Sequence, residues 1–536
     1  MCDVLNTLQS QAFERNLTLL LFILENRDTL EEVGILMNRS LANVNLQDAS
    51  DLLRFCYVND EGVKDVCSCN VLLTELVKRV QRARYEEFVL ILASAYVGYQ
   101  FDLPAFMDFR GRIYRAGVLH FHERDLAKSL ILFASDAKAP ELSKREEISL
   151  RLQLACAAAF KYKKFSSLNK SYSWYIHNSK EMIESDESLI HLALQASDPF
   201  QFLAKVLSNE RVSDLERIRG LNRVPVSQDA SASAYQIMSY LLLNAEMGMR
   251  TNLLPSPEKE IQDFSLCLKD ELQEFLHSRL DNNKYAIIES RLTRMLVKRL
   301  FMPLIYGKTV ITMASDIREV YGSLLSIKDY YHIAQLCHEF WRKKYPDIAN
   351  LMKLINLIGW FCSVLEKPVL YSIPYFTTVQ DYRRSNKADI WVYDRVCKKR
   401  RRVTLRVPAL DRDKRKTQVS TCVNFIHQKD AFIAMKVVEQ LTFKMKAPVY
   451  TVHENFITTS VYAAGVPKIH TKVFMDMGPP LRIINSFIKE NLIRPTIGKL
   501  SNEPYPWYSD RVNNPIPDPI PGESLRTLLI SLEPKD

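Results

Sequence analysis

The segment from residue 294 to residue 307 has the spacing most suggestive of chemistry. It reads Arg-Met-Leu-Val-Lys-Arg-Leu-Phe-Met-Pro-Leu-Ile-Tyr-Gly. Arg294 and Lys298 are four residues apart, so on a helix they project from one face. There an arginine fork and a lysine point charge could bind a triphosphate. Tyr306 could stack on a base, and Gly307 is a natural helix stop. Basic pairs four apart are common on solvated helix faces, but the full R-x3-K-x7-Y-G pattern is not.

Two acidic residues stand in segments of distinctive composition. Asp229 lies in Val-Ser-Gln-Asp-Ala-Ser-Ala-Ser-Ala-Tyr-Gln at 226–236, where small side chains follow the carboxylate. Glu454 lies in Tyr-Thr-Val-His-Glu-Asn-Phe at 450–456, directly after His453. An aspartate close to a serine is by itself usually a helix N-cap. Asp229 therefore gains its significance from its order and context along the chain.

Two further segments combine cationic, histidine and acidic side chains. Residues 104–114 read Pro-Ala-Phe-Met-Asp-Phe-Arg-Gly-Arg-Ile-Tyr, so that Arg110 and Arg112 flank a glycine that permits a tight turn. Residues 423–430 read Val-Asn-Phe-Ile-His-Gln-Lys-Asp and contain His427. A histidine taken at random is more often structural, so the histidines depend on motif position for any functional role.

These five segments, in this order, resemble the motifs of the single-subunit DNA-dependent RNA polymerases of bacteriophages and mitochondria. The resemblance covers the chain from about residue 95 to about residue 465. A segment similar to M-D-[WF]-R-G-R-x-Y lies at 104–114, motif A at 226–236 and motif B at 294–307. A segment similar to N-F-[IV]-H-S-x-D follows at 423–430, and motif C lies at 450–456.

The resemblance implies a fold, a reaction and a division of labour. It implies a mostly α-helical α+β fold shaped as a right hand, with palm, fingers and a thumb remnant and a small antiparallel palm sheet. The reaction is template-dependent addition of ribonucleoside triphosphates to an RNA 3′ end, with two Mg²⁺ ions held by Asp229 and Glu454. The implied catalytic residues are Asp229, Lys298 and Glu454; the substrate-binding residues are Arg294, Lys298, Tyr306, His427 and His453; the nucleic-acid-binding residues are Arg110, Arg112 and Arg299.

The residues that follow Asp229 favour ribonucleotides over deoxyribonucleotides. Family A DNA polymerases share the R-x3-K-x7-Y-G helix, but a bulky glutamate shortly after their motif A aspartate blocks the 2′-hydroxyl. Here the next four residues are Ala, Ser, Ala and Ser. No such gate is visible, so we expect an RNA polymerase with DNA template, RNA product and ribonucleotides as its partners.

Several departures from the family pattern leave a second interpretation open. Glu454 stands where motif C normally has aspartate, and its extra methylene displaces the carboxylate by roughly an ångström, a misplacement that can cost about a hundredfold in rate. Gln428 and Lys429 replace more usual neighbours of His427, and only about a hundred residues precede the Arg110 segment. The alternative is a catalytically impaired polymerase relic that acts only as a nucleic-acid-binding protein.

The elements expected around these motifs are mainly helices. Leucines at i, i+3, i+4 and i+7 from Leu17 to Leu24 predict a helix on which they share one face. Further helices are predicted at 145–160, 258–280 and 285–305, short strands at 447–452 and 457–462, and irregular structure at 504–521. The expected regions are a helical N-terminal or thumb remnant at 1–95 and a palm with the template-contacting segment and motif A at 96–255. Fingers with motif B and a basic insertion are expected at 256–440, and a palm with motif C and a C-terminal tail at 441–536.

Composition agrees with a globular, nucleic-acid-binding protein. The 536 residues carry a net charge of +10, with a pI near 8.9, which suggests a polyanionic partner. A basic run over 398–416 fits a solvated loop, a nuclear-localisation-like patch or a phosphate-tracking segment. The 10 cysteines form no CxxC and suggest reduced thiols. No membrane span or transit peptide is visible, so we expect a monomer away from membranes, encoded inside a mitochondrion as on the linear plasmids of plants and fungi.

Overall fold

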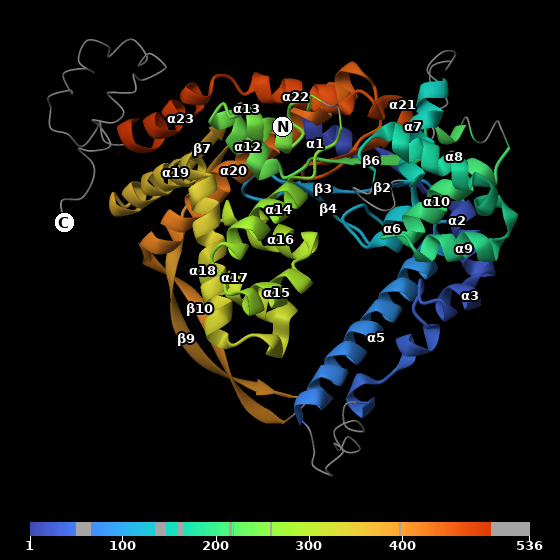
Figure 1. The fold of residues 1–536 in the computed structure, drawn as a ribbon, viewed down its shortest axis with the longest axis horizontal. Helices are drawn as coiled ribbons and strands as arrows, with labels where there is room; N and C mark the ends of the chain where they lie inside the picture. The colour runs from blue at the N-terminus through green and yellow to red at the C-terminus, as the bar shows by residue number, and fades with distance from the viewer. Residues whose placement is uncertain are drawn as a thin grey trace.

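The molecule is a mostly helical α+β fold, as the sequence predicts, and all the described strand pairings are antiparallel. Figure 1 shows helices on both sides of the short central strands. The computed structural model describes residues 1–49, 66–134, 146–158, 165–213, 217, 219–257, 260–395 and 398–494. The segment 504–521, predicted to be irregular, lies outside the described residues.

The first part of the chain is a helical assembly around short strands. Its elements are α1 (Cys2–Gln9), β1 (Ala12–Arg15), α2 (Leu17–Glu25), α3 (Arg27–Glu32), η1 (Arg39–Asn43), α5 (Val66–Ala95), β2 (Phe101–Asp102), β3 (Ala105–Met107), β4 (Ile113–Arg115), α6 (Asp125–Ser129), β5 (Ile131–Phe133), α7 (Glu146–Ala158), α8 (Leu168–Glu184), α9 (Asp186–Leu194) and α10 (Pro199–Glu210).

The middle of the chain, after the first central strand, is almost wholly helical. Its elements are β6 (Pro225–Asp229), α12 (Ser233–Leu241), α13 (Ala245–Arg250), α14 (Phe264–His277), α15 (Asn282–Arg291), α16 (Arg294–Phe301), η2 (Met302–Leu304), α17 (Val310–Tyr321), η3 (Gly322–Leu324), α18 (Ile327–Lys344) and α19 (Pro346–Val364).

The last part contains two β-hairpins, a long helix and the remaining central strands. Its elements are β7 (Val369–Ile373), β8 (Phe376–Gln380), β9 (Arg383–Asp394), β10 (Lys399–Arg412), α20 (Lys414–Glu439), η4 (Gln440–Lys444), β11 (Tyr450–Val452), β12 (Asn455–Thr459), α21 (Ser460–Ala463), α22 (Val466–Asp476), α23 (Pro480–Ile488) and η5 (Lys489–Ile493).

The central sheet has the strand order β11-β12-β6 and joins two distant parts of the sequence. Asn455 pairs with Asp229 at one end of the β12–β6 ladder, and Thr459 pairs with Pro225 at the other. Because side chains alternate along a strand, neighbouring residues of β12 face opposite sides of the sheet. Phe456 packs into the larger hydrophobic core and Ile457 into the second core, so the sheet lies at the junction of the two.

The predicted boundaries needed correction near two of these elements. The helix expected at 285–305 is two helices, because the chain breaks at Leu292 and Thr293 caps α16 by accepting a hydrogen bond from the Leu296 amide. Helix α16 ends at Phe301 rather than at Tyr306, since Pro303 lacks the amide hydrogen that would continue it. The strand predicted at 457–462 is also wrong in its last three residues, which belong to α21.

Helix α2 forms where predicted, but three of the four leucines with helical spacing do not lie in the core. Leu17, Leu21 and Leu24 are exposed, with 44%, 46% and 44% of their surface accessible. The buried residues are Leu19, Leu20, Phe22 and Ile23. Nearly every position of this helix is apolar, so periodicity alone could not determine which side packs against the core.

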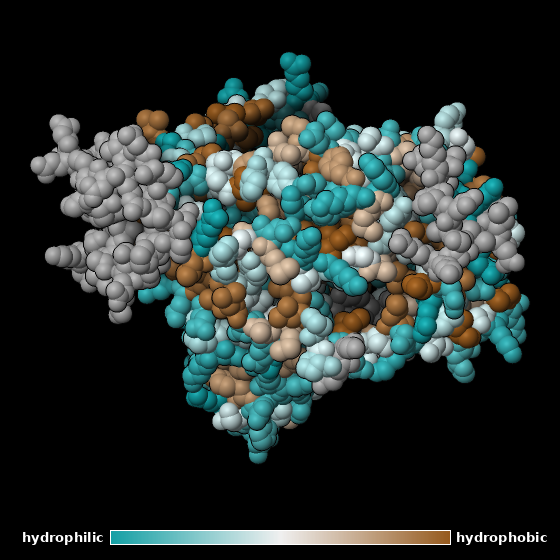
Figure 2. Space-filling model, turned by 90° about the horizontal axis from the view of Figure 1, so that it is seen from above, coloured by the Kyte–Doolittle hydropathy of each residue, from teal (hydrophilic) through white to brown (hydrophobic). Residues whose placement is uncertain are grey.

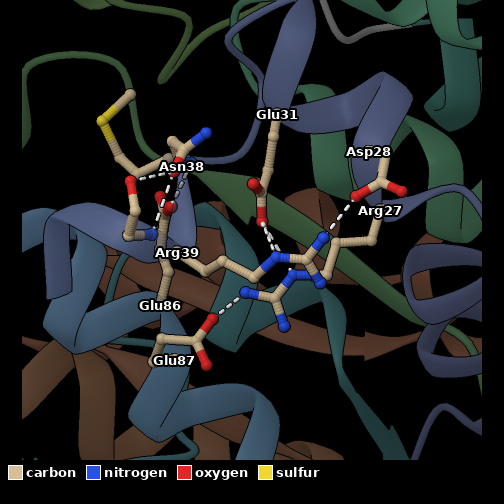
Figure 3. Close-up of polar contacts among 9 residues, drawn as sticks. Arg27, Asp28, Glu31, Asn38, Arg39, Glu86 and Glu87 are labelled. Carbon is tan, nitrogen blue, oxygen red and sulfur yellow. Dashed lines mark hydrogen bonds and ion pairs between the residues drawn. The ribbon is translucent and has the colours of Figure 1, made fainter. Parts of the chain in front are cut away.

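A network of ion pairs fixes the short helices near the N-terminus to α5 (Figure 3). Arg27 bridges Glu31 of its own helix, at 2.8 Å, and Glu87 of α5. Arg39 pairs with Asp28 at 2.5 Å. The Glu86 carboxylate accepts a hydrogen bond from the Met37 amide at 2.7 Å. The two contacts to α5 connect residues that lie 60 and 49 positions apart in sequence.

Most of the basic run, for which a solvated loop is one of the interpretations left open, forms a strand of a long hairpin, β9–β10, which extends from the helical body in Figure 1. Directly opposed residues share a face of an antiparallel ribbon. Arg400 opposes Tyr393, Arg402 opposes Trp391, and Arg406 opposes Lys387. The other face is mainly apolar and carries Ile390, Val392, Val403, Leu405 and Val407. The hairpin therefore has one cationic and aromatic face and one apolar face.

Within the described part of the chain, one helix, α19, is long and apolar enough to cross a membrane by length and composition, a test that core helices also pass. Several of its side chains, Ile355, Ile358 and Cys362 among them, are buried in the larger core. On the face of the molecule seen in Figure 2, hydrophilic and hydrophobic residues are interspersed.

Close packing of α19 on α20 gives a test of the larger core. A Cβ on Gly359 would lie 1.9 Å from the Thr421 Oγ1 atom. We expect Gly359→Ala to lower the free energy of unfolding by about 1–3 kcal/mol, because the helices must separate. Gly220→Ala is the matched control, since its nearest contact would be 3.8 Å. Urea denaturation checks this, and equal effects of the two substitutions would contradict it.

Candidate active site

The two carboxylates singled out from the sequence lie at the same end of the central sheet. Asp229 is the last residue of β6 and pairs with Asn455. Glu454 immediately precedes Asn455, in the turn between β11 and β12. Strand register therefore brings together two acidic residues that are 225 positions apart in sequence.

The turn after Asp229 holds the next helix against the carboxylates. Ala232 has a φ of +57°, a left-handed conformation that is uncommon for a residue other than glycine, and Ser233 begins α12 directly after it. The Ser233 hydroxyl donates a hydrogen bond to Glu454 Oε1 at 3.2 Å. The buried Tyr235 hydroxyl donates to the Phe301 carbonyl at 2.8 Å and so connects α12 to α16.

Helix α16 places its cationic pair on the wall of a cavity of about 860 Å³. Arg294 and Lys298 line this cavity together with Asp229. Arg294 is also held by Asp263, the N-cap of α14, at 2.5 Å. The first turn of α16 is thereby fixed relative to the start of α14.

The turn between β3 and β4 places two arginines near the same carboxylates. Asp108 accepts hydrogen bonds from the amides of Arg110 and Arg112, at 2.9 and 3.0 Å. Gly111 has a φ of +91°, and a Cβ there would lie 1.9 Å from the Phe376 ring, so glycine is required on both grounds. Arg112 pairs with Asp430 at 2.6 Å and lies 3.9 Å from Glu454.

His427 and Tyr306 form a second part of the site. Their ring centroids are 5.1 Å apart. Arg110 contacts His427 Nδ1 at 2.8 Å, and since arginine only donates, Nδ1 accepts and the proton is on Nε2. Burial, reinforced by Arg112 and Arg110, lowers the pKa of His427 to about 3. Burial and the Asp430 and Glu454 carboxylates raise the pKa of Tyr306, which keeps the phenol protonated.

His453 belongs to an aromatic group beside the motif C turn. It has a φ of +55° and lies edge-on to Tyr114, with ring centroids 5.0 Å apart. His122 lies 5.7 Å away by the same measure. Burial, with a contribution from Arg112, lowers the pKa of His453 and favours its neutral form.

Comparison with known proteins agrees with this arrangement. The sequence profile of the family described as DNA-dependent RNA polymerase matches residues 146–491. The chain belongs to this family. A probable DNA-directed RNA polymerase of Zea mays is 31% identical in an alignment 524 residues long that covers 91% of this chain and 48% of the relative. A similarly named protein of Agaricus bitorquis is 25% identical over 77% of this chain and 40% of its own length. The chain spans about half the length or less of these relatives.

A mitochondrial member of the RNA polymerase family is also similar. The mitochondrial DNA-directed RNA polymerase of Neurospora crassa is 25% identical over 230 residues, or 42% of this chain and 16% of its own length. The family profile begins at residue 146 and therefore includes motifs A, B and C but not the Arg110 turn. The predicted family is thus confirmed.

The structure brings together most of the residues that the polymerase motifs predict. Asp229, Arg294 and Lys298 share one cavity. Glu454, Arg112, Tyr306 and His427 are linked through short contacts or mutual electrostatic influence. Arg299, predicted to bind nucleic acid, is not among the cavity residues. It pairs instead with Asp316, at 3.0 Å, and Glu319 of α17.

Asp430 is a site residue to which sequence reasoning gave no role. It is buried on α20, and burial together with repulsion from Glu454 raises its pKa to about 7, although Arg112 opposes this shift. The sequence signal for it was its place three residues after His427 in a family segment. Spacing alone, however, could not show that its partner is Arg112.

The residues at the sheet edge suit Mg²⁺. The donor set is two carboxylates, Asp229 and Glu454, and the described residues contain no group of three or more acidic, His or Cys side chains that could hold a metal unaided. Mg²⁺ typically takes one or two protein carboxylates and completes its coordination with water and substrate phosphates. The site therefore fits an ion that binds together with a nucleotide.

The protonation of His427 gives a pH-dependent prediction. Its pKa of about 3 in the folded state lies below the unfolded value of about 6.5, so the unfolded chain takes up this proton first as the pH falls. Its contribution to stability is intact above pH 6.5 and declines below it. Between pH 7 and pH 5, the free energy of unfolding of the parent chain should fall by up to about 2 kcal/mol more than that of His427→Gln. Urea unfolding at both pH values measures this, and parallel losses would contradict it.

Proposed function

We propose that this chain is a DNA-directed RNA polymerase that extends an RNA 3′ end with ribonucleoside triphosphates on a DNA template. One observation carries the proposal. The carboxylate of Asp229 and the cationic pair of α16 line a single cavity of about 860 Å³, which is large enough for a nucleotide. Membership of the family supports the reaction class.

The cationic wall of the cavity suits a triphosphate. Lys298 is exposed and forms no ion pair with the described residues, so its ammonium group can meet an incoming phosphate. Arg294 stands one helical turn away and is oriented by Asp263. Together the two charges bind the triphosphate and offset its repulsion from Asp229.

The part of the site around Tyr306 and His427 suits recognition of the ribose and base. The protonated Tyr306 phenol and the Nε2–H group of His427 are both hydrogen-bond donors beside the carboxylates. In this proposal they position the nucleotide against the template base and read the 2′-hydroxyl. His453 is assigned to the primer end, because it adjoins Glu454 in the motif C turn.

The carboxylates Asp229 and Glu454 would hold two Mg²⁺ ions. Bound there, the ions would lower the pKa of the primer 3′-hydroxyl and neutralise charge on the triphosphate. The chain itself supplies the remaining cationic charge through Lys298 and Arg294. Arg112 lies close to Glu454 and would orient that carboxylate before substrate binds.

The cationic face of hairpin β9–β10 is proposed to contact nucleic acid. Trp391 and Tyr393 on this face are 68% and 57% exposed, and they are interleaved with arginines. Arginines contact phosphates and exposed aromatic rings stack on bases, so the face suits a duplex or a single strand. Arg110, Arg112 and Arg299 stay proposed contacts to the template or hybrid, although each has an acidic partner in this structure.

The second candidate function is the non-catalytic relic. Glu454 is the observation that favours it, because glutamate replaces the expected aspartate. The hydrogen bond from Ser233 favours a working site instead, since it gives the longer side chain a defined position. We further propose a mitochondrial location, in view of the mitochondrial relatives, and a monomeric state.

Primer extension on an RNA–DNA hybrid scaffold tests the reaction. With Mg²⁺ and labelled ribonucleotides we expect extension by the parent chain and its loss, by about a hundredfold or more, in Asp229→Ala. Lys298→Ala should lower kcat/KM for ribonucleotides by about tenfold to a hundredfold, since the triphosphate then lacks one of its cationic partners. Arg318→Ala, on the neighbouring helix α17, is a control in which a basic residue is removed outside the cavity.

The same assay separates the two candidate functions. A scaffold needs no promoter melting, so the length of the chain before the Arg110 turn does not affect the result. Extension by the parent chain that depends on Asp229 excludes the relic. Absence of extension in the parent chain, with activity gained in Glu454→Asp, would overturn the proposal and establish the relic.

The two faces of the hairpin predict different salt dependence. Replacing Arg400 and Arg406 with Ala should weaken duplex binding. The plot of the log association constant against log salt should also become less steep, by about 0.9 for each phosphate that is no longer neutralised. Lys399→Ala with Arg401→Ala removes the same charge from the opposite face and should change the slope much less. Fluorescence anisotropy over a salt series measures both, and equal slopes would contradict a cationic nucleic-acid-binding face.

A further inference from the structure

The Glu454 carboxylate is held by a partner on each of its oxygens. Ser233 donates to Oε1 at 3.2 Å, and the Arg112 guanidinium lies 3.9 Å from Oε2. The side chain is 28% exposed, so its carboxylate is partly shielded from water but open on one side. Each oxygen keeps further lone pairs for a cation.

Ser233 is itself fixed in position. It is 7% exposed and stands at the first residue of α12, where the left-handed Ala232 directs the chain into the helix. The N-cap position belongs to Ala232, so the Ser233 hydroxyl is not the capping group of this helix. The donor is thus available to Glu454, and the rigid start of α12 determines where it points.

Ser233 also borders the ribose-reading part of the site. It lies beside the Tyr306 phenol, whose pKa it acts to lower against the larger effect of burial. Arg112, on the other side of Glu454, is anchored by Asp430 at 2.6 Å. Glutamate has one more rotatable side-chain bond than aspartate. Between these two anchored groups, rotation about that bond is already restricted before any ion binds.

We propose that Ser233 is a positioning residue that makes glutamate workable at the motif C position, by fixing the longer carboxylate for Mg²⁺. The inference rests on the proposed function. An aspartate on the same backbone is shorter by one methylene and would fall short of the Ser233 hydroxyl. Ser233 and residue 454 are therefore coupled: the hydroxyl matters when residue 454 is Glu and matters little when it is Asp.

A double-mutant cycle tests this coupling with two readouts. The first is the Mg²⁺ concentration for half-maximal primer extension. The second is equilibrium binding of Mn²⁺ followed by its paramagnetic resonance signal, which needs no catalysis. In the Glu454 chain, Ser233→Ala should raise the half-maximal Mg²⁺ concentration and lower the Mn²⁺ affinity, each by about tenfold, because a hydrogen bond to a charged group is removed. In Glu454→Asp, the same substitution should change both by less than about twofold.

Two variants distinguish positioning from general damage. Ser233→Thr retains the hydroxyl and should restore most of the Mn²⁺ affinity. Ser231→Ala removes a hydroxyl from the same segment, where it accepts a hydrogen bond from Asn252 at 3.2 Å, and should leave Mn²⁺ binding unchanged. Circular dichroism of each variant confirms that α12 is intact.

The outcomes separate this inference from the proposed function. Equal weakening by Ser233→Ala in both backgrounds, or no weakening in the Glu454 chain, would overturn the positioning role. If the parent chain does not extend a primer, the proposed function fails. The Mn²⁺ measurements still decide in that case whether Ser233 positions Glu454.

Discussion

The site depends on one constraint, the antiparallel pairing of β12 with β6. This register places Asp229 opposite Asn455 and hence beside Glu454. A slip of one residue would turn every side chain of β12 to the opposite face of the sheet. Phe456 would then leave the larger core and Ile457 the second core, each at a cost of about 1.5–3 kcal/mol for the apolar surface exposed. Packing on both faces therefore fixes the relative position of the two carboxylates.

Charge imposes the second requirement on this edge of the sheet. Burial raises the pKa of Asp430, and the nearby carboxylates of Glu454 and Asp229 raise it further. Arg112 offsets this repulsion by pairing with Asp430, and its own burial is tolerable because the pair is hydrogen-bonded. The Asp108 turn delivers Arg112 to this place. A segment that precedes β6 by more than a hundred residues thus contributes the cation that stabilises these neighbouring carboxylates.

Much of the site could be predicted from residue types and spacing, but its internal contacts could not. The cavity shared by Arg294, Lys298 and Asp229 follows from motifs whose order is visible in the sequence. The roles of Asp430 and Ser233 depend on which residues become neighbours across the fold, and no local pattern contains that information. The basic hairpin resembles a loop in sequence for another reason. Both faces of the ribbon are exposed, so the hydrophobic alternation that identifies a half-buried strand is partly masked by charge.

Glu454 illustrates how the surroundings determine the meaning of a substitution. From sequence alone, an added methylene in a metal-binding turn indicates a displaced carboxylate and a damaged site. In the fold, the hydroxyl of Ser233 and the guanidinium of Arg112 stand at the two oxygens of the longer side chain. Both groups are anchored by elements outside the turn, namely the start of α12 and the Asp430 pair. A decaying metal site has no reason to keep a separate partner for each oxygen, so this arrangement favours a glutamate that the fold accommodates.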